Sequence, residues 1–298
     1  MKVRIGVGLG THTLTNDAET FGPYVEVVEA LGFDSLWLSE RLTGDAPDPL
    51  VALAVAAGRT TRLKLGTGVL VVPGRNPVIL AKELASLDRL SGGRLLPAVG
   101  LGAPTPVEHR AFGVTRKERS AWFDEAVPLM RRLWTEDDVD HDGERFQVEG
   151  VTLRPRPTQD PLEVWLGGFA PSELRRCGRL GDGWLPSFCT VDDVREGWPV
   201  VTAEAERHDR AIDPEHLGAL VTYAHETVPD RVASLLARRR PDLDPTEVIP
   251  IGLDALREQL EAFTEVGASK FVVLPLDEPA SWTDELAALA AAVLPLET

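Results

Sequence analysis

Residues 63–101 read LKLGTGVLVVPGRNPVILAKELASLDRLSGGRLLPAVGL and contain a complete strand–helix–strand unit. Leu63–Val72 and Arg94–Leu101 are almost continuous apolar runs, which is typical of parallel strands covered by helices. Between them, Pro77–Leu90 carries its apolar residues at helical spacing. Because parallel strands need a crossover connection and a helix is its usual form, this stretch predicts an α/β fold.

The same alternation continues on both sides of this unit. Further strands are expected at Val3–Leu9, Asp34–Leu38, Val164–Leu166, Gly183–Pro186, Leu217–Ala224 and Lys270–Leu274. Further helices are expected at Ala18–Leu31, Asp48–Arg59, Arg116–Trp134, Ser172–Leu180, Val191–Arg210, Leu253–Val266 and Trp282–Leu294. Eight such units favour a closed (β/α)8 TIM barrel, with an open doubly wound sheet as the alternative.

Two segments interrupt the alternation. Asp138–Leu153 follows the fourth strand and its helix and has the pattern of a hairpin with a turn near Asp142-Gly143. Pro229–Arg240 forms a charged connection after the seventh strand. We therefore expect a TIM barrel with insertions after strands 4 and 7. No linker or low-complexity tract divides the chain, so residues 1–298 are expected to form a single domain.

Composition excludes several classes of partner. The net charge of −16 disfavours nucleic acid and anionic membrane surfaces. No apolar run has the length of a membrane span or of a signal peptide. Cys177 and Cys189 form no CxxC pair, and no histidines cluster with them, so neither a structural metal site nor a disulfide framework is expected. These features indicate a cytoplasmic protein.

The active site of a parallel α/β barrel lies at the carboxyl ends of its strands. The loops that follow the first five expected strands are Gly8–Thr13, Ser39–Arg41, Gly68–Arg75, Gly100–Ala103 and Gly167–Ser172. Glycine recurs in these loops, where it allows close approach of a ligand and anion binding by free backbone amides. Tight turns alone could also explain it. No complete GxGxxG motif is present, so a Rossmann site is not predicted.

Charged residues in these loops are the candidate catalytic groups. Glu40 and Arg41 end the second strand and could orient a polar ring or transfer a proton, or could form only a surface ion pair. His12, after the first strand, is a lesser candidate for proton transfer. The acids at Asp137–Asp142 lack the ligand spacing of a calcium loop and indicate a charged hairpin. Arg238–Arg240 either ends a solvated helix or attracts a polyanionic cofactor tail.

Several runs, taken together in this order, resemble a known family. They are Leu31–Trp37, Gly66–Val69, Asn76–Lys82, Leu87–Arg94, Val99–Gly102, Ala111–Val114, Arg154–Gln159, Trp165–Gly168 and Gly181–Trp184. With LDRLSGGR and LGG…GDGW as its most specific motifs, the chain resembles the luciferase-like monooxygenases over about residues 1–190, with a further match near residues 267–273.

The resemblance implies a barrel that binds FMN or the deazaflavin F420 at its C-terminal mouth. By position, the cofactor site comprises Gly68, Val69, Gly100, Leu101, Gly102, Ala103, Gly167, Gly168 and Trp184. Within this set, the backbone of Leu101–Ala103 and of Gly167-Gly168 would hold the phosphate. Gly68-Val69 matches a bulge that carries a cis peptide bond behind the ring in deazaflavin members. Glu40 matches an acid that is usually Asp in relatives. Homodimers are common in the family.

Within the family, the chain is most similar to the F420-dependent branch. The resemblance therefore implies hydride transfer between F420 and a small organic substrate. An FMN-dependent monooxygenase is the main alternative, and a catalytically silent flavin-binding barrel is another. F420-dependent glucose-6-phosphate dehydrogenases are similar but carry an acid where this chain has Ala103 and a histidine where it has Arg41. Oxidation of a sugar phosphate is therefore not expected, and the variable loops leave the substrate open.

Overall fold

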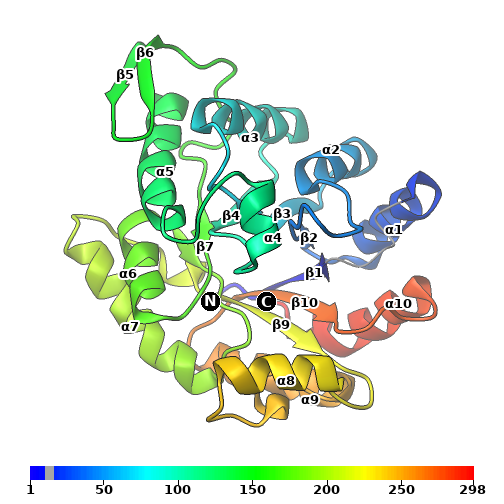
Figure 1. The fold of residues 1–298 in the computed structure, drawn as a ribbon. Coiled ribbons are helices and arrows are strands. Elements are labelled where there is room, and N and C mark those ends of the chain that lie inside the picture. Colours follow the sequence, from blue (N-terminus) through cyan, green and yellow to red (C-terminus); the bar gives the residue numbers. More distant parts are fainter. Residues whose placement is uncertain (11–16) are drawn as a thin grey trace. The chain divides into compact units, whose positions relative to one another are not determined.

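The computed structural model describes residues 1–10 and 17–298, whose helices and strands are drawn in Figure 1. His12 lies outside the described residues. In the described part of the chain, eight strands of the main sheet are β1 (Arg4–Gly10), β2 (Ser35–Leu38), β3 (Lys64–Val71), β4 (Leu95–Gly100), β7 (Trp165–Leu166), β8 (Gly183–Trp184), β9 (Gly218–Tyr223) and β10 (Lys270–Pro275). The helices that separate and follow them are α1 (Ala18–Leu31), α2 (Pro49–Arg59), α3 (Pro77–Ser91), α5 (Arg119–Thr135), α6 (Pro171–Leu180), α7 (Val191–Glu206), α9 (Gly252–Glu265) and α10 (Trp282–Val293).

The expected alternation of strands and helices is confirmed, with ends that shift by a few residues. The sequence predicted one helix from Arg116 and another to Arg210, whereas α5 begins at Arg119 and α7 ends at Glu206. Between β4 and β7 the chain also forms α4 (Pro106–Ala111) and a hairpin of β5 (Val139–Asp142) and β6 (Gln147–Val151). Between β9 and β10 it forms α8 (Asp230–Arg239) in addition to α9.

Two compact units make up the described chain. Unit 1 consists of Met1–Leu9, Val27–Leu36 and Gly167–Thr298, and unit 2 consists of Gly10–Glu26 and Trp37–Leu166. In unit 1, β10 pairs in parallel with β1 and with β9. α6 and α7 pack closely because Gly178 has no side chain, and a Cβ there would collide with the Val201 carbonyl oxygen. In unit 2, β4 pairs in parallel with β3 and with β7.

The helices of unit 2 begin where capping residues are available. The Asp48 carboxylate accepts hydrogen bonds from the amides of Leu50 and Val51, and Asn76 does the same for the first amides of α3. Proline is the first residue of both α2 and α3, where a missing N–H costs nothing. α3 ends at Gly92, whose φ of 73° is left-handed and favours glycine.

The LDRLSGGR motif of unit 2 is structural. Asp88 is fully buried, and its carboxylate accepts hydrogen bonds from the amides of Thr158 and Gln159 at 2.6 and 3.0 Å. Arg94 donates to the carbonyl oxygens of Ala57 in α2 and of Leu63, which directly precedes β3. The motif therefore connects α3 to the segment that leads into β7 and to the preceding helix.

The β5–β6 hairpin is joined to α5 through one carboxylate. Glu125 of α5 accepts hydrogen bonds from the amides of Arg145 and Phe146 and contacts the His141 ring at 3.1 Å. Burial alone would raise the pKa of Glu125, but the hydrogen bonds from His141 and the two amides outweigh it and lower that pKa. The hairpin is therefore held by an ionised carboxylate.

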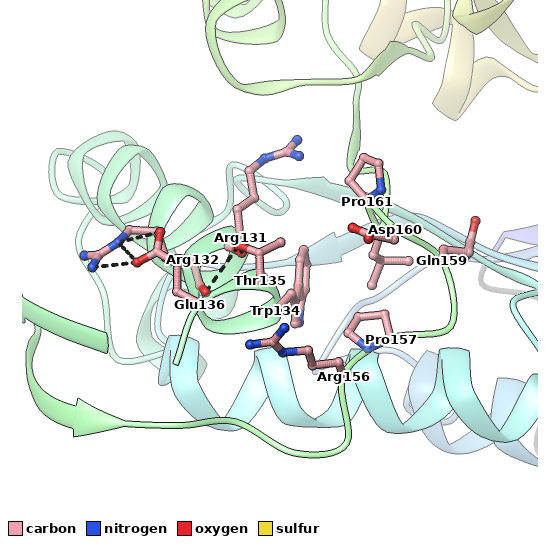
Figure 2. A pocket seen from close by; sticks show the side chains of 11 residues that line it. Arg131, Arg132, Trp134, Thr135, Glu136, Arg156, Pro157, Gln159, Asp160 and Pro161 are labelled. Atoms are coloured by element: carbon pink, nitrogen blue, oxygen red, sulfur yellow. Dashed lines mark hydrogen bonds and ion pairs between the residues drawn. The ribbon is translucent and has the colours of Figure 1, made fainter. Parts of the chain in front are cut away.

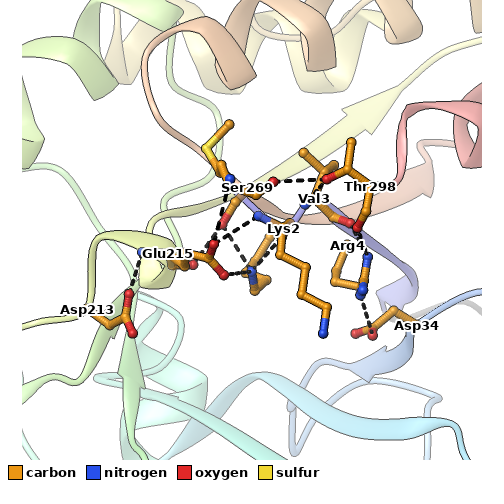
Figure 3. A network of polar contacts seen from close by, with 10 residues as sticks. Lys2, Val3, Arg4, Asp34, Asp213, Glu215, Ser269 and Thr298 are labelled. Atoms are coloured by element: carbon orange, nitrogen blue, oxygen red, sulfur yellow. Dashed lines mark hydrogen bonds and ion pairs between the residues drawn. The ribbon is translucent and has the colours of Figure 1, made fainter.

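A polar network in unit 1 surrounds the start of β1 (Figure 3). The Thr298 hydroxyl accepts from the Val3 amide, and Arg4 donates to the Thr298 carbonyl oxygen. Arg4 also lies 3.7 Å from Asp34, and Glu215 accepts from the Lys2 amide at 2.9 Å. These contacts lie at the amino end of β1, whereas the loops expected to carry chemistry follow the carboxyl ends of the strands.

Candidate active site

Residues directly after β2 form hydrogen bonds to a bulge in the neighbouring strand β3. The Ser39 hydroxyl donates to the Gly68 carbonyl oxygen at 2.8 Å, and the Glu40 amide donates to the Val69 carbonyl oxygen at 3.2 Å. The pairing of β3 with β4 shifts register at this point, and the Gly68-Val69 peptide bond is cis, as the resemblance implied. Gly100 leaves room for the bulge, because a Cβ there would lie 2.8 Å from the Val69 side chain.

Glu40 is paired with an arginine, but this arginine is Arg75 and not its neighbour Arg41, a pairing that the sequence left open. Its side chain is only 2% exposed and forms an ion pair with Arg75, which follows β3. Its second oxygen accepts a hydrogen bond from the Val71 amide at 2.6 Å, and Asp48 lies 3.3 Å from Arg75. Burial raises the pKa of Glu40, while Val71 and Arg75 oppose this rise. Arg75 is thus a site residue that the sequence reasoning did not single out.

Arg41 occupies a different environment from Glu40. It is exposed, and the charge it faces is the buried carboxylate of Glu108 on α4. Glu108 accepts hydrogen bonds from the amides of Leu42 and Thr43 and from the Thr43 hydroxyl. Burial alone would raise the pKa of Glu108, but these hydrogen bonds and Arg41 lower it. Glu108 therefore orders the loop after β2, and Arg41 is left at its surface.

The loop after β4 is held by Arg119, the first residue of α5. Its Nη1 donates to the carbonyl oxygens of Leu101 and Gly102, both at 3.0 Å. Gly102 has a φ of 79°, and a Cβ there would lie 2.9 Å from Val71, so both conformation and space require glycine. Leu101, Gly102 and Ala103 are all half-buried. Unit 2 thus brings the predicted residues of three loops, after β2, β3 and β4, into one connected set of contacts.

The remaining predicted cofactor residues belong to unit 1. Trp184 is fully buried and donates from its ring nitrogen to the Gly168 carbonyl oxygen at 2.7 Å. Because its side chain is buried, Trp184 would influence a ligand only by fixing the backbone of Gly168, whose φ is 86°. At the start of α6, which follows Gly167-Gly168, one backbone amide is already bound within the helix. The Glu173 carboxylate accepts a hydrogen bond from the Ala170 amide at 3.1 Å.

A pocket of about 210 Å³ lies beside Gly168 in unit 1. Phe169, Phe188 and Leu236 form part of its wall, and the Arg240 guanidinium lies 5.1 Å from the centre of the Phe169 ring. Arg240 is paired with Asp193 at 2.8 Å and with Asp242 at 3.0 Å. Its charge is therefore already compensated, which weakens the interpretation of Arg238–Arg240 as an anchor for a polyanionic tail.

A larger pocket, of about 440 Å³, lies at the end of α5 in unit 2 and is shown in Figure 2. Arg132, Trp134 and Arg156 line it, and no predicted site residue does. It adjoins the segment that leads into β7, and so lies at the amino end of that strand. Nearby Asp137 pairs with Arg154 and Arg156. Among the residues that the structure describes, no three or more histidine, cysteine or acidic side chains form a metal-binding group.

One buried positive charge in unit 2 favours the binding of an anionic cofactor. Arg119 is 8% exposed and lies beside the glycine-containing loop after β4, yet no carboxylate of the described residues is paired with it. A buried cation without a counter-charge is costly, and a phosphate-bearing ligand would supply one. The residues present are therefore compatible with the phosphate of F420 or FMN.

Comparison with known proteins identifies the family of this chain. The luciferase-like monooxygenase family matches residues 2–290, so the chain belongs to that family. An F420-dependent glucose-6-phosphate dehydrogenase of Intrasporangium calvum is 36% identical over 197 residues, which are 60% of this chain and 57% of that protein. The corresponding enzyme of Beutenbergia cavernae is 32% identical over 236 residues, 68% of each chain. This chain thus spans little more than half the length of the first relative.

Solved structures establish the fold class. The monooxygenase RslO1 from Streptomyces bottropensis has a TM-score of 0.78 and 25% identity, over 98% of this chain and 99% of that one. A coenzyme F420 dependent tetrahydromethanopterin reductase from Methanopyrus kandleri has a TM-score of 0.79 and 17% identity, over the whole of both chains. With eight strands and their helices in the expected order, the predicted (β/α)8 barrel class is confirmed.

Proposed function

We propose that this protein is an F420-dependent oxidoreductase that transfers a hydride between the deazaflavin and a small organic substrate. The observation that carries the proposal is the similarity to F420-dependent dehydrogenases, at 32–36% identity in the two relatives described. An FMN-dependent monooxygenase is the second candidate, because the structure of the monooxygenase RslO1 is also similar. A silent barrel that binds a flavin without turnover is the third.

The protein's own residues would bind and orient the cofactor, which supplies the hydride chemistry when bound. Gly68 and Val69, held by Ser39 and Glu40, would lie behind the ring. Arg41 is exposed and free to contact substrate, whereas Glu40 is engaged by Arg75 and acts as a positioning group. His12 remains a predicted proton-transfer group.

Backbone amides are proposed to bind the cofactor phosphate. In unit 2 these belong to the loop Gly100–Ala103, which Arg119 holds by its carbonyl oxygens. In unit 1 they belong to Gly167 and Gly168, and Trp184 would fix Gly168 through its 2.7 Å hydrogen bond. Phosphate binding is proposed separately for the amides of each unit.

The substrate is proposed to differ from glucose 6-phosphate. The resemblance implies an acid and a histidine in such dehydrogenases at the places where this chain has Ala103 and Arg41. The structure gives Arg41 an exposed position and leaves Ala103 half-buried in the loop after β4. A chain without these two groups lacks part of the chemistry that those enzymes use.

Equilibrium binding of F420 and of FMN tests the proposal. The purified protein is titrated with each cofactor, and cofactor fluorescence is followed. We expect tight F420 binding, weak FMN binding and reduction or oxidation of F420 with some alcohols or activated double bonds, but none with glucose 6-phosphate. Preferred FMN binding with oxygen uptake would establish the monooxygenase instead, and F420 binding without any turnover would indicate the silent barrel.

Residues 1–298 are proposed to act as one domain in the cytoplasm. The family match over residues 2–290 supports the first statement. The second is supported by two buried thiols, Cys177 and Cys189, which form no disulfide and suit a reducing compartment. No helix of the described residues is long and apolar enough to cross a membrane.

A homodimer is proposed, with α2 and α3 of each protomer in the interface. Val51 and Val55 lie one turn apart on α2 and are 63% and 46% exposed, and Ile79 on α3 is 59% exposed. We expect sedimentation velocity to give twice the mass of one chain. Val51→Glu combined with Val55→Glu should give monomers, whereas Val200→Glu, at an apolar residue of α7 that is 41% exposed and lies outside the proposed interface, should not. A monomeric wild-type protein would contradict the proposal.

A further inference from the structure

Arg119 is a buried cation whose charge the described residues leave uncompensated. Among the residues that the structure describes, only two acceptors contact its guanidinium. They are the carbonyl oxygens of Leu101 and Gly102, which are neutral and both bound by Nη1. Burial, and then the charge of Arg116, lower the pKa of Arg119, and no acid opposes them. The protein thus holds a cation where its environment disfavours one, which points to a missing negative partner.

The unused part of the guanidinium has the geometry of an oxyanion receptor. Nε is buried and has no hydrogen-bond partner in the part of the chain that the structure describes, and none is found there for Nη2. Nε and Nη2 together present two parallel N–H groups, the edge by which arginine binds carboxylate or phosphate in a bidentate manner. Since Nη1 is fixed on the loop, this edge is held in a defined orientation.

Two further buried polar atoms without partners belong to α4 and its N-cap. The Thr105 hydroxyl and His109 Nε2 are buried and make no hydrogen bond with the described residues. Thr105 precedes α4 and His109 lies one helical turn further on, so both side chains are on the same side of α4. Burial, then Arg119 and Arg116, lower the pKa of His109. The neighbouring acid, Glu108, is already engaged by Leu42 and Thr43.

We propose that Arg119, Thr105 and His109 form an oxyanion-binding site next to the loop after β4. Arg119 would bind the anion through Nε and Nη2, while the Thr105 hydroxyl and the neutral His109 ring donate further hydrogen bonds. The ligand group is a phosphate or a carboxylate. It belongs either to the cofactor or to an anionic substrate, and only this choice of ligand rests on the proposed function.

Inorganic phosphate tests the site without any cofactor. The melting temperature of the cofactor-free protein is measured over a range of phosphate concentrations, with chloride at matched ionic strength as reference. We expect phosphate to stabilise the wild-type protein, and Arg119→Met to weaken the apparent phosphate affinity about tenfold or more, the effect of losing a charge-assisted bidentate contact. Arg110→Met, which removes an exposed arginine of α4, is the matched control and should leave phosphate stabilisation unchanged.

Thr105→Val provides a second variant in case Arg119→Met folds poorly. Because the Thr105 hydroxyl has no partner among the described residues, its removal should not lower the melting temperature without phosphate. It should nevertheless reduce the stabilisation by phosphate. Equal phosphate stabilisation of the wild-type protein and of both variants, or none in the wild-type protein, would overturn the proposal.

The source of the anion is distinguished by two deazaflavins. F420 and its phosphate-free riboside are titrated into the wild-type and Arg119→Lys proteins, and the dissociation constants are compared. Weaker binding of F420 alone assigns the anion to the cofactor phosphate. Unchanged binding of both, together with lost phosphate stabilisation, assigns it to the substrate. Failure of the wild-type protein to bind either deazaflavin would refute the proposed function but would leave the result with inorganic phosphate standing.

Discussion

Arg75→Met is expected to lower the free energy of unfolding by about 3–5 kcal/mol, the usual cost of breaking a buried ion pair from one side. Glu40 is 2% exposed in its side chain, and Arg75 is the cation paired with it. Without Arg75, the carboxylate would either remain charged in an apolar environment or take up a proton. Urea denaturation followed by tryptophan fluorescence measures the loss.

The double variant Glu40→Gln/Arg75→Met distinguishes a pairing effect from lost packing. It removes both charges, so we expect it to recover a large part of the stability lost in Arg75→Met. The Glu40→Gln amide can still accept the hydrogen bond from the Val71 amide through its oxygen. No recovery in the double variant would mean that Arg75 stabilises the protein through contacts other than its ion pair.

Arg59→Met is the matched control for this experiment. Arg59 pairs with Glu26 at 2.8 Å, but their side chains are 43% and 53% exposed. An exposed pair of this kind contributes at most about 1 kcal/mol. If Arg75→Met lowers the free energy of unfolding no more than Arg59→Met does, the buried pair of Glu40 and Arg75 stabilises the protein no more than an exposed ion pair.

Glu40 and Arg41 do not form the ion pair that was the alternative interpretation of these two residues, and the reason is geometric. Glu40 and Arg41 are adjacent in sequence and follow a strand, where successive side chains point to opposite sides of the chain. Adjacency therefore argues against a direct pair rather than for one. The true partner, Arg75, comes 35 positions later. Arg75 can be recognised as the partner of Glu40 only when the loops after β2 and β3 are known to lie side by side. The periodicity of strands and helices in the sequence does not show which loops are neighbours.

Other features of the site were predictable for different reasons. Gly68, Gly100 and Gly102 were identified because they lie toward or just beyond the carboxyl ends of strands. The structure explains Gly100 and Gly102 by steric limits at Val69 and Val71. α4 escaped prediction, since a helix of six residues is too short for apolar periodicity to appear. Two of the three proposed anion-binding residues belong to α4 or its N-cap, so they were missed with it.

F420 binding is expected to weaken as the pH falls through the raised pKa of Glu40, because Glu40 then loses its charge. Burial is the largest influence on Glu40 and raises its pKa above the ordinary carboxyl value, against the opposing effects of Val71 and Arg75. Protonation therefore occurs at a higher pH than for a free glutamate. It ends the ion pair with Arg75 that fixes the carboxylate against the β3 bulge. Below the raised pKa, affinity should fall up to about tenfold per pH unit, as for a single linked proton.

The same shift gives a signed prediction for stability. A folded state that raises the pKa of Glu40 binds a proton more readily than the unfolded chain, so the contribution of Glu40 decreases as the pH rises from the unfolded to the folded pKa. Glu108 and Glu125 have lowered pKa values and act in the opposite sense, losing stability as the pH falls through their folded pKa values. Loss of F420 binding through Glu40 should therefore begin at a higher pH than acid unfolding through those two groups.

Two variants separate Glu40 from its surroundings in this experiment. Glu40→Gln should bind F420 with little pH dependence over the range in which the wild-type affinity falls. Glu83→Gln is the control, because partial burial also raises the pKa of Glu83, which lies near the charges of Arg75 and Asp48 but forms no ion pair with Arg75. It should keep the wild-type pH profile. A profile that flattens in Glu83→Gln and persists in Glu40→Gln would assign the titrating group to Glu83 and would remove the role proposed for the Glu40–Arg75 pair in cofactor binding.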